Sequence, residues 1–181
     1  IPNVTVVANI QYSTPSACLK GKNIIVTGGG RGLGFSMAKK FVAEGANVLI
    51  AGRNVSTLQK SAKEIGCKYL ALDVQDVDSF PSFIFEAEKQ LGGLDCLVNN
   101  AGISLHENGF IDVSKKQFEA QFDTNLKGPF FLTQVFVEHC LKAEDKKMKK
   151  VIFTSSETSM TVDERPYGLT KAAINSLVQG L

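Results

Sequence analysis

The sequence has few cysteines and histidines, no excess of either charge and no hydrophobic run that approaches the length of a bilayer span. Its longest apolar stretches, at residues 4–10 and 130–137, fall well short of the ~20 residues that a transmembrane helix needs. Twenty Lys and Arg stand against 18 Asp and Glu, for a net charge of +2. We therefore expect no transmembrane helix, and the charge balance gives no support for a nucleic acid or a membrane as partner.

The few cysteines and histidines indicate neither a disulfide framework nor a metal centre. No two cysteines form a CxxC pair, and three of the four lie in or beside apolar runs, which is typical of buried thiols in a reducing cytosol. Neither histidine has a carboxylate or cysteine at metal-ligand spacing. The N-terminus lacks an initiator methionine and a secretion signal, so it looks trimmed and not targeted. We predict a cytoplasmic protein without a metal site; the residues concerned are Cys18, Cys67, Cys96, Cys140, His106 and His139.

The composition, 44% hydrophobic and 21% charged, is that of a globular protein able to bury a core, and 181 residues suffice for one domain. After residue 22, short β-branched runs alternate with amphipathic segments of helical period, a pattern typical of βαβ units and a parallel sheet. The predicted strands cover residues 23–27, 46–51, 68–72, 94–98 and 150–154. The predicted helices cover residues 32–44 with Gly45 as C-cap, 55–65, from Asp76 or Ser79 to about 91, from the capping box Ser114/Gln117 to 143, and 166–181.

Two segments of the chain do not fit a regular alternation. Gly128 and Pro129 interrupt the long helical region, so we expect a kink or a restart there. Residues 1–22 precede the first predicted strand, and they could form an added edge strand, a partner-contact arm or a simple ordered tail. The predicted organisation is thus an N-terminal extension over residues 1–22 and one domain over residues 23–181.

A glycine-rich loop joins the first predicted strand to the first predicted helix, with the sequence TGGGRGLG from Thr27 to Gly34. A strand that turns tightly into a helix directs backbone N–H groups and the positive end of the helix at a phosphate, and glycines permit the close approach. The spacing differs from that of a Walker loop. Glycines also serve simple tight turns, but the position between a strand and a helix favours a dinucleotide site.

The residues beyond the loop indicate which dinucleotide binds. A site for NAD normally has an acidic residue at the end of the second strand, whereas this strand ends Ala51-Gly52-Arg53. Arg53 and Arg31 place two guanidinium groups where a 2′-phosphate would lie, unless they are solvated surface charges. We therefore predict that the cofactor is NADP(H).

Near the end of the chain, Tyr167 and Lys171 form a YxxxK motif on a helix that Pro166 can begin. Residues four apart share a helical face, so the ammonium can reach the phenol, and a positive charge favours the phenolate form of a tyrosine. The spacing predicts that Tyr167 acts as a general acid or base. The motif alone occurs by chance in many proteins, so it indicates catalysis only in combination with the other motifs of this sequence.

Taken together, these motifs resemble the short-chain dehydrogenase/reductase family over about residues 22–181. The family's TGxxxGxG loop, its NNAG motif at residues 99–102, an asparagine in the long helix, a serine pair after the fifth strand and the YxxxK motif all occur in order. Among family members, the similarity to 3-oxoacyl-carrier-protein reductases and to sugar or polyol dehydrogenases is equally generic. The resemblance implies a Rossmann-like, doubly wound parallel sheet in a three-layer α/β/α arrangement.

The resemblance also implies roles for individual residues. Hydride would pass between NADP(H) and a carbonyl or secondary alcohol, with Tyr167 as general acid/base, Ser156 polarising the oxygen and Lys171 lowering the pKa of the tyrosine. Asn125 would anchor a proton-relay water, or satisfy backbone groups freed by the helix kink. Asp73 matches the acidic residue that contacts adenine. The implied cofactor-binding residues are Thr27, Gly28, Gly30, Arg31, Gly32, Leu33, Gly34, Arg53, Asp73, Val74, Asn100, Ala101, Gly102, Tyr167 and Lys171.

Two departures from the family pattern bear on function. Ser156 lies eleven residues before Tyr167 and Ser155 twelve, where the family usually has thirteen. A displaced serine would suit the alternative of a non-catalytic NADP(H)-binding scaffold or sensor. The family also has two further strands, so we expect the protein to continue beyond Leu181 by about 60 residues. The family's helix pairing implies a homodimer or homotetramer, formed through the long helix and the helix that begins at Pro166.

Overall fold

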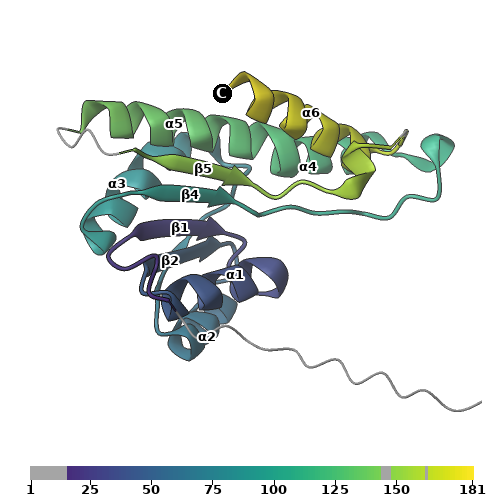
Figure 1. Cartoon of the computed structure of the whole chain (residues 1–181). Coiled ribbons are helices and arrows are strands. Elements are labelled where there is room, and N and C mark those ends of the chain that lie inside the picture. Colours follow the sequence, from purple (N-terminus) through teal and green to yellow (C-terminus); the bar gives the residue numbers. More distant parts are fainter. Residues whose placement is uncertain (1–15, 144–147, 162) are drawn as a thin grey trace, which may run out of the picture.

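The computed structural model describes residues 16–143, 148–161 and 163–181. The strand considered for residues 4–10 lies outside the described residues. In the described part, five parallel strands form one sheet in the order β3-β2-β1-β4-β5 (Figure 1). Their bounds are β1 Asn23–Thr27, β2 Asn47–Gly52, β3 Lys68–Ala71, β4 Cys96–Asn99 and β5 Lys150–Phe153. The predicted parallel sheet is confirmed.

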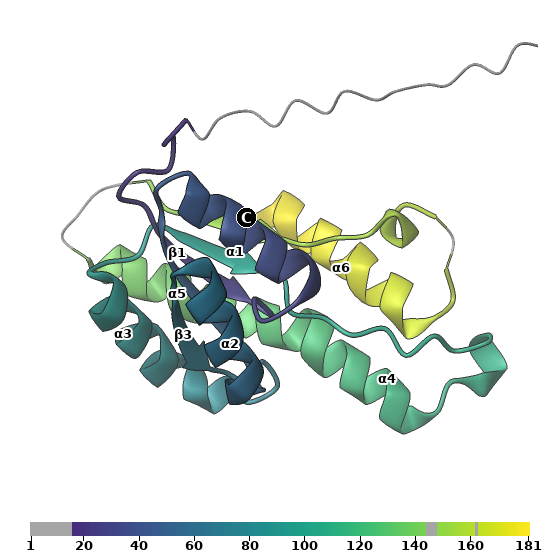
Figure 2. The same ribbon diagram turned by 90° about the horizontal axis from the view of Figure 1, so that it is seen from below.

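Helices cover both faces of this sheet. Helices α1 and α2 lie on one face, in front in Figure 2, and α3 and α5 pack on the other. Alternation within β1 explains the two layers, because Ile25 packs toward α3 and α5 while Ile24 and Val26 pack toward α1 and α2. The helix bounds are α1 Gly32–Ala43, α2 Val55–Ile65, α3 Phe80–Leu91, α4 Lys115–Phe122, α5 Gly128–Lys142 and α6 Pro166–Gly180.

Some predicted boundaries move by one or two residues. The second strand begins at Asn47 and not at residue 46, and the fourth begins at Cys96 and not at residue 94. The Asp95 side chain, just before the fourth strand, accepts a hydrogen bond from the Asn23 amide at 2.9 Å. Helix α1 ends at Ala43 with Glu44 as its C-cap, and the predicted cap Gly45 follows with φ +88°. The capping box of Ser114 and Gln117 is confirmed.

The interruption at Gly128-Pro129 takes the form of a wide helical turn. A π-helical turn, η3 (Asp123–Lys127), connects α4 directly to α5, and the Gly128 amide donates to the Asp123 carbonyl. Pro129 then lies in the first turn of α5, where its missing N–H costs no helical hydrogen bond. The helix axis therefore continues, and the predicted kink is a π-turn whose extra residue accommodates the proline.

Residues 16–22 attach to the C-terminal end of α1 through Glu44. The Glu44 side chain is buried, and its Oε2 atom accepts hydrogen bonds from the Ser16 amide at 2.8 Å and the Ser16 hydroxyl at 2.9 Å. Lys40 Nζ lies 2.7 Å from Oε1. The bonds from Lys40 and Ser16 lower the pKa of Glu44 to about 2. The carboxylate therefore ties the described end of the N-terminal extension to the domain.

This lowered pKa predicts a pH-dependent contribution to stability. A carboxyl whose pKa is depressed by folding stabilises the protein above its unfolded pKa, here 4.5, and loses that effect as the pH falls toward 2. We expect the Glu44→Gln variant to unfold at a lower urea concentration than the wild type at pH 7. The difference between their unfolding midpoints should become smaller as the pH falls from 4.5 to 2. Glu64→Gln, which removes an exposed carboxylate 3.4 Å from Lys39, is the control with little effect. A difference in unfolding midpoint that stays constant with pH would contradict this role of the Glu44 carboxylate.

Candidate functional site

A cleft lies at the carboxyl ends of the strands, where the order of the sheet reverses between β1 and β4. In open α/β sheets this switch point is the usual ligand site. The cleft has a volume of about 460 Å³, which is within the range of small-molecule sites. It is lined by Gly28, Gly30, Arg31, Gly32, Ala51, Gly52, Arg53, Asn54, Thr57, Leu58, Leu72, Val74, Asn100, Ala101, Gly102, Ile103 and Thr124.

The glycine loop needs its glycines for two different reasons. Gly28 and Gly32 have φ angles of +65° and +56°, which side chains of other residues rarely adopt. Gly34 has no room for a side chain, because a Cβ atom would lie 2.4 Å from the Gly28 carbonyl oxygen and 2.5 Å from Asn100 Nδ2. The loop therefore packs tightly on itself while Gly28, Gly30 and Gly32 form part of the cleft surface.

Thr27 and Asn100 connect this loop to the end of β4. The Thr27 hydroxyl accepts hydrogen bonds from the amides of Asn100 at 3.0 Å and Ala101 at 3.1 Å, and donates to the Val98 carbonyl at 3.2 Å. Asn100 Nδ2 donates to the Thr27 carbonyl at 3.0 Å. Thr27 is buried by these contacts and is not part of the cleft surface, so its side chain shapes the loop. Its contact with a cofactor stays a prediction.

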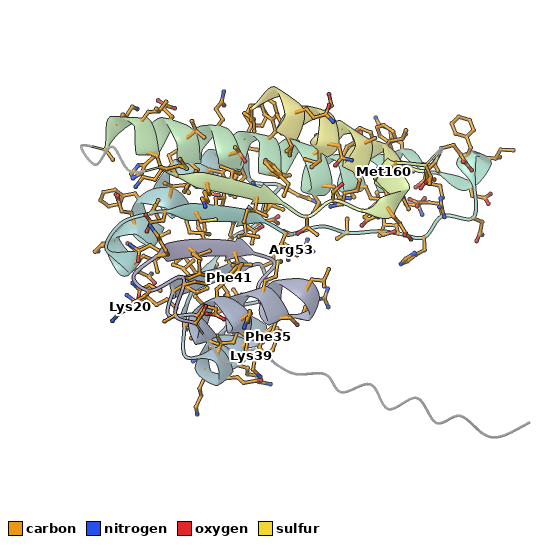
Figure 3. All side chains as sticks on the ribbon, in the orientation of Figure 1. Lys20, Phe35, Lys39, Phe41, Arg53 and Met160 are labelled. Carbon is orange, nitrogen blue, oxygen red and sulfur yellow. The ribbon has the colours of Figure 1, made fainter. Side chains whose placement is uncertain are left out.

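The predicted arginines and the predicted acidic residue lie in different surroundings. Arg31 and Arg53 both line the cleft, and Figure 3 shows Arg53 beyond the carboxyl end of the sheet. Asp73 is exposed and accepts a hydrogen bond from the Gln75 amide at 3.0 Å. Its neighbours Leu72 and Val74 line the cleft, whereas Asp73 does not. The contact of Asp73 with adenine stays a prediction.

Lys171 lies one helical turn beyond Tyr167 on α6, as the YxxxK spacing predicts. Its side chain is only 5% exposed, and its ammonium donates to the Thr154 carbonyl at 2.7 Å. Burial lowers the pKa of Lys171 below its ordinary value. The ammonium lies 5.6 Å from the centre of the Tyr167 ring and 3.7 Å from where a Cβ atom of Gly102 would be. The Lys171 ammonium therefore lies near both the tyrosine and Gly102, which lines the cleft.

Asn125 lies in the π-turn η3 and is 98% buried. Its Oδ1 atom accepts from the Ile103 amide at 2.8 Å, and its Nδ2 atom donates to the Ile103 carbonyl at 2.8 Å and to Thr170 Oγ1 at 3.3 Å. The side chain therefore bonds to the segment after β4 and to α6, rather than to backbone groups of its own helix near Gly128. Asn125 holds together three of the segments that surround Lys171.

The hydroxyl groups that follow β5 make different hydrogen bonds. Thr154 Oγ1 donates to Asn100 Oδ1 at 3.2 Å, and Ser155 Oγ donates to Asn175 Oδ1 at 2.6 Å. Ser156 Oγ instead accepts from the Thr158 hydroxyl at 3.0 Å and the Thr158 amide at 3.4 Å. Among the hydroxyl groups of Thr154, Ser155 and Ser156, only that of Ser156 accepts and does not donate in the hydrogen bonds of the described residues. The Ser156 hydroxyl can therefore donate its proton to another group.

The structure also places residues in and around the site that the sequence did not single out. Asn54, Thr57 and Leu58 line the cleft from the start of α2, and Asn54 caps this helix by accepting from the Thr57 amide. Because asparagine is a preferred N-cap residue, Asn54 directly after Arg53 could have been predicted from the sequence to begin α2 next to the cleft. Thr170 and Asn175 contact the site from α6, but a contact across 20 to 45 residues leaves no local pattern. The predicted cofactor-binding residues that lie outside the cleft surface are Thr27, Leu33, Gly34, Asp73, Tyr167 and Lys171.

In the part of the chain that the structure describes, no helix is both long and apolar enough to cross a membrane.

Comparisons with curated proteins identify relatives that are dehydrogenases or oxidoreductases. Oxidoreductase UcpA of Salmonella typhimurium is 32% identical over 170 residues, which cover 90% of this chain and 63% of the relative. Galactitol 2-dehydrogenase of Agrobacterium fabrum is 34% identical over 170 residues, which cover 89% of this chain and 63% of the relative. The chain thus spans about 63% of the length of these relatives.

Comparisons with solved structures agree. A 3-oxoacyl-[acyl-carrier protein] reductase from Brucella melitensis in complex with NAD has a TM-score of 0.77 and 29% identity, over 87% of this chain and 65% of that chain. A short chain dehydrogenase from Burkholderia cenocepacia in complex with NADP has a TM-score of 0.77 and 26% identity, over 90% of this chain and 67% of that chain. The family model described as short chain dehydrogenase matches residues 22–181. The chain therefore belongs to the short-chain dehydrogenase family.

Proposed function

We propose that this chain forms the cofactor-binding and proton-transfer part of an oxidoreductase that moves hydride between NADP(H) and a carbonyl or secondary alcohol. The observation that supports this most is the position of Lys171. Its buried ammonium lies 5.6 Å from the centre of the Tyr167 ring and 3.7 Å from where a Cβ atom of Gly102 would be. This position supports a role for Tyr167 in proton transfer next to the cleft. A binding scaffold without chemistry has no need of this arrangement.

The cleft fits a dinucleotide phosphate in shape and in charge. Gly28, Gly30 and Gly32 leave backbone exposed at the start of α1, where N–H groups and the helix dipole favour an anion. Arg31 and Arg53 add two cations to the same surface. When bound, the nicotinamide cofactor supplies or accepts the hydride.

The chain's own residues then move the proton and hold the reacting oxygen. Tyr167 donates a proton to the oxygen during reduction and takes it back during oxidation. Ser156, whose hydroxyl accepts two hydrogen bonds from Thr158, donates its own proton to that oxygen and polarises it. Lys171 places its ammonium 5.6 Å from the centre of the Tyr167 ring, and Asn125 fixes the π-turn against Ile103 and α6.

The two cleft arginines support a preference for NADP(H) over NAD(H). A guanidinium can make two charge-assisted hydrogen bonds to a phosphate, and both arginines are available to a ribose 2′-phosphate. Since relatives with solved structures are complexed with NAD in one case and NADP in another, the choice rests on these residues.

The preference predicts a cofactor switch. Arg53→Asp replaces a cation by a carboxylate that repels the 2′-phosphate and can accept from a 2′-hydroxyl, so the ratio of NADPH to NADH affinity should fall by about 100-fold. Fluorescence titration with both cofactors measures this ratio. Lys39→Asp makes the same charge change on α1 at an exposed residue outside the cleft, and should leave the ratio unchanged. An unchanged ratio in Arg53→Asp would contradict the proposal.

A direct assay tests the reaction itself. NADPH oxidation should be measured with a panel of ketones, diketones, keto sugars and 3-oxoacyl thioesters. Turnover with any of them supports the oxidoreductase. Cofactor binding without turnover would favour the non-catalytic scaffold instead.

The proposal extends to the organisation and assembly of the protein. We propose one domain over residues 23–181 with residues 1–22 as an extension, in the cytoplasm and acting on a small molecule. Large apolar side chains remain exposed on α5 and α6, which supports pairing of these helices in a homodimer or homotetramer. These side chains are Phe130, Phe131, Val137, Leu141, Leu169 and Val178. Analytical ultracentrifugation would give the number of subunits.

A further inference from the structure

The connection between β5 and α6 is short, and its first turn has little apolar packing. The 3-10 turn η4 (Glu157–Ser159) contains no buried residue, and Met160 directly after it is 87% exposed (Figure 3). Burial of side chains therefore contributes little to the shape of this turn. The hydrogen bonds of the segment must define where Ser156 lies.

Those hydrogen bonds converge on the side chain of Asn175 in α6. Asn175 Oδ1 accepts from Ser155 Oγ at 2.6 Å, and Asn175 Nδ2 donates to Ser159 Oγ at 2.7 Å. Ser159 Oγ in turn donates to the Ser156 carbonyl at 2.5 Å. One amide thus holds both ends of the turn, and Ser156 lies between the two anchored serines.

Asn175 also lies one helical turn beyond Lys171. Residues four apart occupy the same side of a helix, so the anchor of the turn and the ammonium beside Tyr167 are presented by one rigid element. The distance between the Ser156 segment and the Tyr167–Lys171 pair is then set by α6 itself. A connection that is two residues shorter than the family pattern can still be placed accurately by this means.

We infer that Asn175 is a positioning residue, whose amide holds the Ser155–Ser159 turn so that the Ser156 hydroxyl meets the reacting oxygen. The inference rests on the proposed function of Ser156, and it gives Asn175 no contact with substrate or cofactor. Loss of the amide releases both anchors of the turn without changing the cleft. A small displacement of an oriented group lowers a rate strongly while it leaves binding at a separate surface intact.

A double-mutant cycle tests the inference. Asn175→Ala should lower kcat by about 10- to 100-fold, with less than about a two-fold change in the Kd for NADPH. In a Ser156→Ala background the same change should have almost no further effect on kcat, because the group it positions is gone. Ser176→Ala, at the next, exposed residue of α6, is the matched control with wild-type kcat. An equal loss of kcat in both backgrounds would overturn the inference.

Amide hydrogen exchange separates this inference from the proposed function. The amides of Ser159 and Met160 donate to the carbonyls of Ser156 and Glu157 within the turn, at 3.1 and 2.9 Å. Asn175→Ala should accelerate their exchange, whereas Ser176→Ala should not. If the wild-type protein shows no turnover, the proposed function fails and exchange still decides whether Asn175 holds the turn. Unchanged exchange in Asn175→Ala overturns the inference whatever the activity.

Discussion

Tyr167→Phe is expected to lower kcat by about 10²- to 10⁴-fold while NADPH still binds with nearly its original affinity. The substitution removes only the phenolic hydroxyl, and the ring keeps its place 5.6 Å from the Lys171 ammonium. Tyr167 does not line the cleft, so the binding surface is unchanged. The loss should therefore appear in turnover and not in the Kd for the cofactor.

A matched substitution on the sheet, away from α6, controls for a general effect of losing a tyrosine hydroxyl. Tyr69 lies half-buried on β3, at the opposite edge of the sheet from β5, so Tyr69→Phe should retain wild-type turnover. Steady-state assays of both variants, combined with fluorescence titration of NADPH, give the comparison. Near-native turnover in Tyr167→Phe would remove Tyr167 as the proton donor.

Gly128→Ala is expected to destabilise the protein, although alanine usually stabilises a helix by about 0.5–1 kcal/mol relative to glycine. A Cβ atom on Gly128 would lie 2.1 Å from the Val74 carbonyl oxygen and 3.2 Å from that of Asp123. Both neighbours are backbone atoms, which cannot turn away as a side chain can. Relief of the clash requires α5 to move away from the segment that follows β3, at a cost of about 1–3 kcal/mol.

The measurement is thermal or urea unfolding, where this cost corresponds to a fall in Tm of roughly 2–12 °C. Val74 lines the cleft, so the affinity for NADPH should fall as well. Gly180→Ala, at the end of α6 where a Cβ atom meets nothing within 4 Å, should be neutral or slightly stabilising. A Gly128→Ala protein as stable as the wild type would show that the contact with Val74 relaxes freely.

Local signals account for the parts of the fold that the sequence predicted well. The second helix runs from Val55 to Ile65 as predicted because Asn54 caps one end and Gly66, with φ +78°, ends the other. The glycine loop was recognisable because a tight turn from a strand into a helix restricts residue type at nearly every position. Spacing alone also predicted that Tyr167 and Lys171 share a face of α6.

The features that the sequence did not reveal depend on contacts between distant segments. The π-turn forms where Gly128 meets the Val74 carbonyl, 54 residues away, and a proline pattern by itself predicts only a kink. Asn175 reads as an ordinary polar residue of an amphipathic helix until the short turn after β5 is placed beside it. The hydrogen bond from the Gln75 amide to the Asp73 side chain is likewise visible only in the structure, and the adenine contact of Asp73 stays a prediction.

The amide of Asn125 acts on Ile103 as a neighbouring β-strand would. It accepts from the N–H and donates to the C=O of the same residue, which is the pair of bonds exchanged across one rung of a sheet. A helix therefore supplies one sheet-like rung to the segment that leaves β4. Aspartate has the same shape but can only accept when ionised, and glutamine is one methylene longer. Asparagine is thus the side chain whose length and polarity both match the backbone of a strand at this position.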